Sequence, residues 1–188
     1  MRRVLLLGGG VAAALAAAAA AYLAIGNGAG GPPLSGTVAA FAATSPEAAP
    51  EITFSDAGGN TLTLDDFAGQ VVLLNFWATW CAPCVREMPA LDRVQRSLGD
   101  EGLAVVALGL DQDGLDAIEP FFREHDLDNL AIYLDPAYAT PAPFGVIGLP
   151  TTIVIDREGR VVGRLDGWAE WDAPEAETLL RHYLGPPP

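Results

Sequence analysis

The sequence predicts an α/β sandwich built around a mixed central sheet. Two nearly continuous apolar runs, VVLLNFW (71–77) and LAVVALGL (103–110), are typical of strands buried on both faces. Each run is followed by a segment whose apolar residues recur at helical spacing. Two later segments, TTIVID and VVGRL, flank a turn that contains REG and predict a hairpin, so the sheet is not purely parallel.

The folded domain is expected over residues 51–185. Its first segments, EITF and NTLTL, alternate polar and apolar residues around the Gly-rich SDAGG, which predicts a β-hairpin. After the strand at 71–77, a helix is expected over 82–98, because its apolar residues recur every three or four positions. Pro89 lies inside this helix and should kink it.

The second half of the domain continues the alternation. A helix is expected over 113–127 and a short strand at AIYLD, before the hairpin of TTIVID and VVGRL. The last helix lies in DAPEAETLLRHYL. We expect Asp172 to be its N-cap, Pro174 to lie in its first turn and Glu175 to complete a capping box.

Residues 1–25 are predicted to be a membrane anchor or a signal segment. No charge occurs from Val4 to Ile25, and a run of about 20 apolar residues can span a bilayer as a helix. Arg2 and Arg3 precede it, which favours an N-terminus that stays in the cytoplasm. A cleaved signal peptide is the alternative, because sites of the A-x-A type recur through the run.

Residues 26–50 are predicted to be a flexible tether. They consist mostly of Gly, Ala, Pro, Ser and Thr, with few large apolar side chains. Such a segment buries too little surface to offset the entropy of ordering it. It would hold the domain away from the membrane.

The charge balance excludes nucleic acid as a partner. The chain has 10 basic and 24 acidic residues, and without Arg2 and Arg3 the exported part has 8 against 24, or −16. Phosphate backbones would repel such a domain. Solubility is the simpler reason for the acidity, and steering toward a basic or metal-bearing partner is the alternative.

Both cysteines of the chain lie in FWATWCAPC, as Cys81 and Cys84. A zinc site needs four ligands, and the only histidines, His125 and His182, lie far apart on different predicted helices. Covalent haem attachment needs a histidine directly after the second cysteine, where this chain has Val85. A structural disulfide across so short a loop would stabilise little. The pattern therefore favours a redox centre without metal or cofactor.

The position of the pair supports this hypothesis. Cys81 follows a buried strand and opens a helix, whose free N–H groups and partial positive charge favour a thiolate. Cys84 lies one turn further on and can attack a mixed disulfide formed at Cys81. Pro83 between them stiffens the turn.

The segment VVLLNFWATWCAPCVREMPAL resembles the active-site segment of the thioredoxin superfamily, and more narrowly of the exported, membrane-anchored TlpA-like branch with its relatives ResA and DsbE. GLPTTIVIDREGRVVGRLDG is similar to the second signature of that family. The resemblance implies a thioredoxin-like three-layer sandwich with an N-terminal β-hairpin extension. It also implies that Pro150 is cis and faces the cysteines, and that the backbone at Leu149 pairs with a substrate strand.

The proton chemistry should differ from that of thioredoxins. They carry a buried aspartate six residues before the first cysteine, where this chain has Asn75, whose amide cannot accept a proton. We expect Asn75 to be a hydrogen-bonding residue of the core. The resemblance to ResA-like proteins places a functional glutamate at Glu87, which would have a raised pKa and shuttle the proton. The alternative is a solvated glutamate close to Arg86 or Arg93.

The tryptophans divide into core and surface. Trp77 is expected in the core as part of its strand, and Trp80, beside Cys81, is expected to line the substrate-binding surface. Trp168 and Trp171 belong to the segment WAEW, which resembles alphaproteobacterial TlpA proteins. Packing near the last helix is favoured for both, and a partner-facing patch is the alternative.

The resemblance implies a thiol–disulfide oxidoreductase that acts mainly as a reductant. Its expected partners are a protein disulfide substrate and a membrane thiol donor. The substrate would be a copper chaperone or subunit of cytochrome oxidase, which WAEW favours, or apocytochrome c. Together with the N-terminal segment, it predicts a single-pass protein of the inner membrane with its catalytic domain in the periplasm.

Two other functions remain as alternatives. A peroxiredoxin-like peroxidase wants a threonine three residues before its cysteine, whereas Thr79 lies two before Cys81. A copper-binding assembly chaperone spaces its cysteines by three residues and adds a histidine, whereas this chain spaces them by two.

Overall fold

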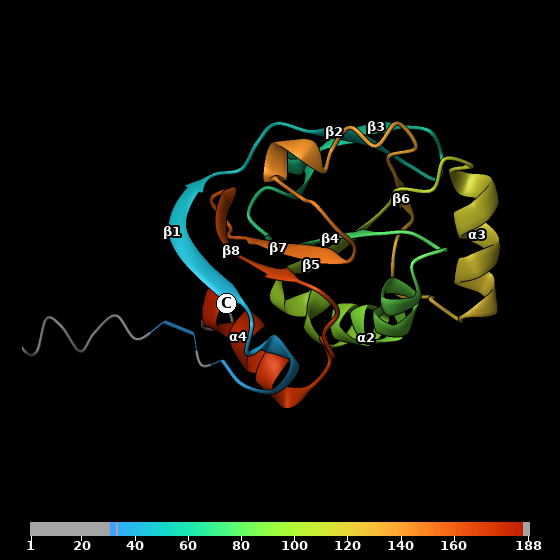
Figure 1. The fold of residues 1–188 in the computed structure, drawn as a ribbon. Coiled ribbons are helices and arrows are strands. Elements are labelled where there is room, and N and C mark those ends of the chain that lie inside the picture. The colour runs from blue at the N-terminus through green and yellow to red at the C-terminus, as the bar shows by residue number, and fades with distance from the viewer. Residues whose placement is uncertain (1–30, 33, 186–188) are drawn as a thin grey trace, which may run out of the picture. The chain divides into compact units, whose positions relative to one another are not determined.

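The computed structural model describes residues 31–32 and 34–185, so the predicted anchor at residues 1–25 lies outside the described part. Among the described residues, no helix is both long and apolar enough to cross a membrane. This described part has one eight-stranded sheet and three α-helices (Figure 1). The strands are β1 (Ala42–Ala48), β2 (Thr53–Asp56), β3 (Thr61–Thr63), β4 (Val71–Trp77), β5 (Leu103–Gly109), β6 (Tyr133–Leu134), β7 (Thr151–Ile155) and β8 (Arg160–Asp166). The helices are α2 (Ala82–Leu98), α3 (Leu115–Glu124) and α4 (Pro174–Leu184).

The sheet is mixed, as predicted. Its strand order is β1-β8-β7-β4-β5-β6-β2-β3. β5 runs parallel to β4 and β6, and the other neighbours are antiparallel. Every residue of β4 and β5 is buried, which explains their continuous apolar runs. β4 lies in the middle of the strand order. The cysteines follow its carboxyl end and therefore lie at the end of a central strand.

The two faces of the sheet are covered differently. Side chains of α2, α3 and α4 pack with one set of alternate strand residues, including Leu73 and Val105. The other set, including Leu74 and Val106, packs with the β2–β3 hairpin and with the 3-10 segments η2 (Leu64–Phe67) and η4 (Ala142–Phe144). The molecule therefore has three layers, of which the sheet is the middle one.

The predicted tether at residues 26–50 is wrong for its C-terminal half. Ala42–Ala48 forms β1, which pairs with β8 and extends the sheet at that edge (Figure 1). Just before it, Val38 and Phe41 are buried in the core. The compact unit thus begins at Pro32, well before the predicted boundary at residue 51. Backbone pairing with an edge strand needs no large side chains, which is why composition alone was misleading.

The start of α4 also differs from its prediction. The N-cap is Ala173, and no side chain caps this helix. Asp172 instead pairs with Arg93 of α2 at 2.6 Å. Pro174 does occupy the first turn. The acidic residue that was predicted to begin the helix therefore connects it to the helix that carries the cysteines.

Candidate active site

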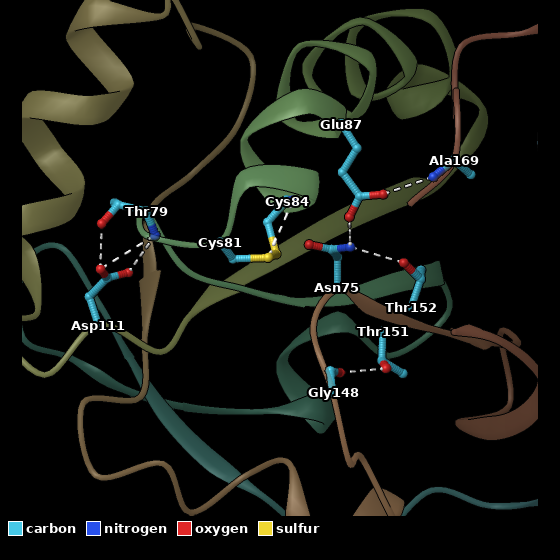
Figure 2. The surroundings of a disulfide bond; sticks show 10 residues. All are labelled: Asn75, Thr79, Cys81, Cys84, Glu87, Asp111, Gly148, Thr151, Thr152 and Ala169. Atoms are coloured by element: carbon cyan, nitrogen blue, oxygen red, sulfur yellow. Dashed lines mark hydrogen bonds between the residues drawn. A yellow bond between two sulfur atoms is a disulfide. The ribbon is translucent and has the colours of Figure 1, made fainter. Parts of the chain in front are cut away.

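The cysteine pair forms a disulfide at the start of α2 (Figure 2). Cys81 is the N-cap of the helix, and its Sγ accepts a hydrogen bond from the backbone N–H of Cys84 at 3.3 Å. Cys81 is 7% exposed, whereas Cys84 is fully buried. Cys81 is thus the sulfur that a partner can reach.

The local backbone favours attack by Cys81. Once the disulfide is reduced, the Cys81 sulfur lies among the free N–H groups of the helix start, which stabilise a thiolate. Cys84 lies one turn inside the helix and has no contact with solvent. This arrangement suits an outer nucleophile and an inner resolving thiol, the roles that the sequence predicts for Cys81 and Cys84.

Glu87 is buried beneath the pair, so it is not the solvated glutamate of the alternative interpretation. Its side chain is only 1% exposed and accepts hydrogen bonds from Asn75 Nδ2 at 2.6 Å and from the Ala169 backbone N–H at 3.0 Å. Burial raises the pKa of Glu87 from 4.5 to about 7, and these two hydrogen bonds partly oppose the rise. A carboxyl group with this pKa can hold or release a proton at neutral pH.

Asn75 lies in the core and makes hydrogen bonds, as predicted. It is fully buried, and its Nδ2 also donates to Thr152 Oγ1 of β7 at 2.9 Å. Figure 2 shows its amide extending from the side of Glu87 to the disulfide. Neither carboxylate oxygen of Glu87 makes a hydrogen bond to a cysteine among the described residues, and Asn75 lies between the two in Figure 2.

The Leu149–Pro150 peptide bond is cis, as the resemblance implies. Pro150 is buried and Leu149 is half-buried. Leu149 precedes the first residue of β7, and within residues 34–185 its backbone takes part in no strand ladder. The Pro150 carbonyl accepts from the Gly167 N–H and the Gly148 carbonyl from the Thr151 hydroxyl, so Leu149 is the residue of this segment that could pair with a substrate strand.

Comparison with known proteins identifies the family. The family model described as Redoxin matches residues 44–180, most of the chain. The chain belongs to the Redoxin family. This Redoxin protein is 34% identical over 136 residues to "Thiol-disulfide oxidoreductase ResA" of Bacillus thuringiensis subsp. konkukian, covering 72% of the chain and 74% of the relative. It is 32% identical to the ResA of Bacillus subtilis, covering 72% of each.

A solved structure agrees with these relatives. The Redoxin chain matches the crystal structure of a putative thiol:disulfide interchange protein DsbE from Chlorobium tepidum with a TM-score of 0.68 and 31% identity, covering 76% of this chain and 99% of that one. The fold is therefore thioredoxin-like, and the sequence resemblance to the TlpA-like branch is confirmed. The Cys81–Cys84 disulfide and these relatives show a thiol–disulfide oxidoreductase.

The outer surface of this Redoxin site carries exposed apolar side chains. Trp80 is 68% exposed, Tyr138 is 48% exposed and Ile147 is 98% exposed. Trp80 and Tyr138 line a hollow of about 420 Å³ together with Asp111 and Asp113. Large apolar side chains left in water beside a reactive sulfur are typical of a docking surface.

Sequence reasoning missed two parts of the site. Thr79 donates its hydroxyl and backbone N–H to Asp111, at 2.5 and 3.0 Å, and so holds the loop before Cys81. The position of Asp111, directly beyond the carboxyl end of the buried β5, was the available signal. The other part is the cover over Glu87, formed by Ala169 and the buried Trp171. The Trp171 indole N–H lies close enough to Glu87 to lower the pKa of its carboxyl group, although among the described residues it makes no hydrogen bond of good geometry.

The two tryptophans of WAEW have different environments. Trp171 is buried in the core, as favoured by the sequence. Trp168 is half-buried, and the Arg86 guanidinium lies 3.5 Å from the centre of its ring. WAEW therefore contacts the helix of the cysteines twice, through the Trp168 ring at Arg86 and through the Ala169 backbone N–H at Glu87.

Proposed function

We propose that this oxidoreductase works outside the cytoplasm as a reductant of protein disulfides during the assembly of respiratory cytochromes. The observation that carries the proposal is the setting of Cys81. The slightly exposed Cys81 follows the exposed Trp80 in the chain, and the resemblance to thioredoxin-like proteins implies that the cis-Pro150 segment faces it, which would leave room for an extended polypeptide. A folded or unfolded protein, rather than a small molecule alone, fits such an open surface.

The proposed reaction is a two-step exchange. The Cys81 thiolate attacks one sulfur of the substrate disulfide, forming a mixed disulfide and releasing the other substrate sulfur as a thiolate, which takes up a proton. Cys84 loses its proton and attacks Cys81, which restores the Cys81–Cys84 disulfide and releases the second substrate thiolate. Glu87, with a pKa of about 7, takes the proton from Cys84 after a side-chain rotation or through one water molecule.

Substrate binding is assigned to the residues around this sulfur. Trp80 and Pro83 are exposed on either side of Cys81. Leu149 offers its backbone to an extended strand, and Pro150 sets the direction of that segment. The hollow beside Trp80 takes a side chain that neighbours the substrate cysteine.

The N-terminal sequence supports the proposed location, and the location in turn requires a source of electrons. The uncharged run from Val4 to Ile25 after Arg2 and Arg3 supports an inner-membrane anchor with the domain in the periplasm. In an oxidising compartment a reductant needs electrons from elsewhere, and a thiol donor in the same membrane would supply them. The segment WAEW favours a substrate of copper-centre assembly over apocytochrome c.

A covalent trap tests the proposal. Cys84→Ser leaves Cys81 joined to its partner, because no second thiol can resolve the mixed disulfide. Capture of a copper chaperone, an oxidase subunit or apocytochrome c from the native host supports the pathway. The control is the double variant Cys81→Ser/Cys84→Ser, which cannot form a mixed disulfide. Capture of cytoplasmic proteins alone, or of no protein beyond those recovered with this control, contradicts the proposal.

A further inference from the structure

One buried oxygen of the site has no hydrogen-bond partner. Asn75 Oδ1 is fully buried and unpaired among the described residues. Buried polar atoms are almost always paired, so an unpaired one beside a reaction centre calls for a cause. The same residue is otherwise firmly held, because its Nδ2 makes two hydrogen bonds.

These two hydrogen bonds fix which way the amide faces. Nδ2 donates to the Glu87 carboxylate and to Thr152 Oγ1, and with Glu87 ionised an exchange of the oxygen and nitrogen positions would place two acceptor oxygens 2.6 Å apart. Oδ1 therefore lies on the opposite branch of the amide. Figure 2 shows this branch pointing toward the Cys81–Cys84 disulfide. A disulfide has no hydrogen to donate, so the oxygen stays unpaired in this oxidation state.

We propose that Asn75 is a positioning residue that favours the reduced form, because its Oδ1 accepts a hydrogen bond from the Cys84 thiol. Reduction by a dithiol transfers two electrons to the disulfide and turns the donor into a disulfide. Of the two donor protons, one ends on Cys84 and the other is released, while Cys81 remains a thiolate. The Cys84 S–H is then the donor that Oδ1 lacks.

Cys84 rather than Cys81 is the partner because of its burial. The Cys84 sulfur has no access to solvent, so no water can serve its S–H group. Cys81 lies at the exposed start of the helix, where backbone N–H groups favour a thiolate. The new bond thus exists only after reduction, and it shifts the redox equilibrium toward the dithiol. This inference concerns the exchange chemistry and does not depend on the identity of the substrate.

The redox equilibrium with dithiothreitol tests the inference. Asn75→Leu removes the acceptor while keeping a similar volume. We expect its equilibrium constant for reduction to fall about fivefold, the usual effect of one hydrogen bond. For a two-electron couple this is a shift of about 20 mV toward more negative potential, since tenfold corresponds to 29.6 mV. An unchanged or increased constant would overturn the proposal.

A matched variant separates this effect from simple damage to the core. Thr152→Val removes the second acceptor of Nδ2 and leaves Oδ1 untouched. It should destabilise the oxidised and reduced proteins equally and leave the redox constant unchanged. The Asn75→Leu effect should also persist when Glu87→Gln is present. If Thr152→Val shifts the constant as much, or if Glu87→Gln abolishes the shift, Asn75 acts by another route and the proposal is wrong.

A vibrational measurement gives an independent readout. In Cys81→Ser the only thiol is that of Cys84, and its S–H stretch should lie below that of a thiol in an apolar solvent. Adding Asn75→Leu should raise the frequency. If the double variant does not fold, Cys81→Ser decides alone, because a stretch at the apolar-solvent position would rule the hydrogen bond out.

Discussion

The side-chain nitrogen of Asn75 donates a hydrogen bond of 2.6 Å to Glu87, although one residue lies on the central strand and the other on the helix of the cysteines. This bond joins β4 to α2 one turn beyond Cys84. Burial, which this bond partly opposes, gives the Glu87 carboxyl a pKa of about 7, whereas the strand position at which thioredoxins carry an aspartate is occupied here by Asn75 itself. In the proposed mechanism the proton-handling group therefore lies on the helix rather than on the strand, with Asn75 between it and the sulfurs.

Glu87→Gln should remove a pH dependence from the resolving step. In the wild type, ionisation of Glu87 near pH 7 provides a base for the Cys84 proton, so the rate of mixed-disulfide resolution should rise as the pH increases through 7. The variant should lose this rise and be at least about tenfold slower at pH 8. Stopped-flow tryptophan fluorescence between pH 5 and 9 measures it.

The control for that experiment is Glu119→Gln, which removes an exposed carboxylate from α3. Its pH profile should match the wild type. Identical profiles for the Glu87 variant and the wild type would show that Glu87 takes no part in proton transfer.

Glu87→Gln should also change how the free energy of unfolding depends on pH. The folded-state pKa of about 7 exceeds the unfolded value near 4.5, so the folded protein binds more protons between these values. Stability contributed by the neutral carboxyl is present below pH 4.5 and is lost as the pH rises to 7. The shift corresponds to about 3 kcal/mol. In urea unfolding of the oxidised protein, the free energy of unfolding of Glu87→Gln should gain about this much relative to the wild type as the pH rises from 4.5 to above 7. Parallel curves of unfolding free energy against pH would contradict the prediction.

The sequence alone could predict the centre of the fold and the cysteine site. β4 and α2 were correct because a fully buried strand leaves a continuous apolar run and a helix leaves a three-and-four spacing. β1 was missed because all of its side chains are exposed, so its sequence has no apolar run or alternation to mark it as a strand.

The burial of Glu87 lay beyond local sequence patterns. The residue that seals it, Ala169, is 82 positions away in the chain and comes close only after the sheet has formed. The sequence could not predict the unpaired oxygen of Asn75 either, because the orientation of the amide follows from contacts with α2 and β7 together. The residue types singled out Asn75 and Glu87 in the sequence. The pKa of Glu87 and the orientation of the Asn75 amide depend on tertiary packing.

Trp80→Ala should weaken the reaction with protein disulfides and spare small ones. Its side chain is 68% exposed next to Cys81 in the chain, so most of its surface is available to a partner. We expect KM for a protein disulfide such as insulin to rise about five- to tenfold, and the rate with oxidised glutathione to stay within about twofold. Trp80→Phe should restore most of the binding. Equal losses with both substrates would point to damage at Cys81 instead.

Gly163→Ala tests whether the chain before residue 51 belongs to the domain. A Cβ at this position of β8 would overlap the Phe41 ring and lie 2.8 Å from the Ala42 carbonyl oxygen. Overpacking of this kind costs about 1–3 kcal/mol of unfolding free energy. In a Phe41→Ala background much of that cost should disappear, because the ring is the nearer obstacle. Gly148→Ala, where a Cβ meets nothing within 4 Å, should change stability by less than about 0.5 kcal/mol. A flexible tether would leave β8 uncovered and make Gly163→Ala as neutral as this control, so denaturant titrations of the variants distinguish a tether from a strand.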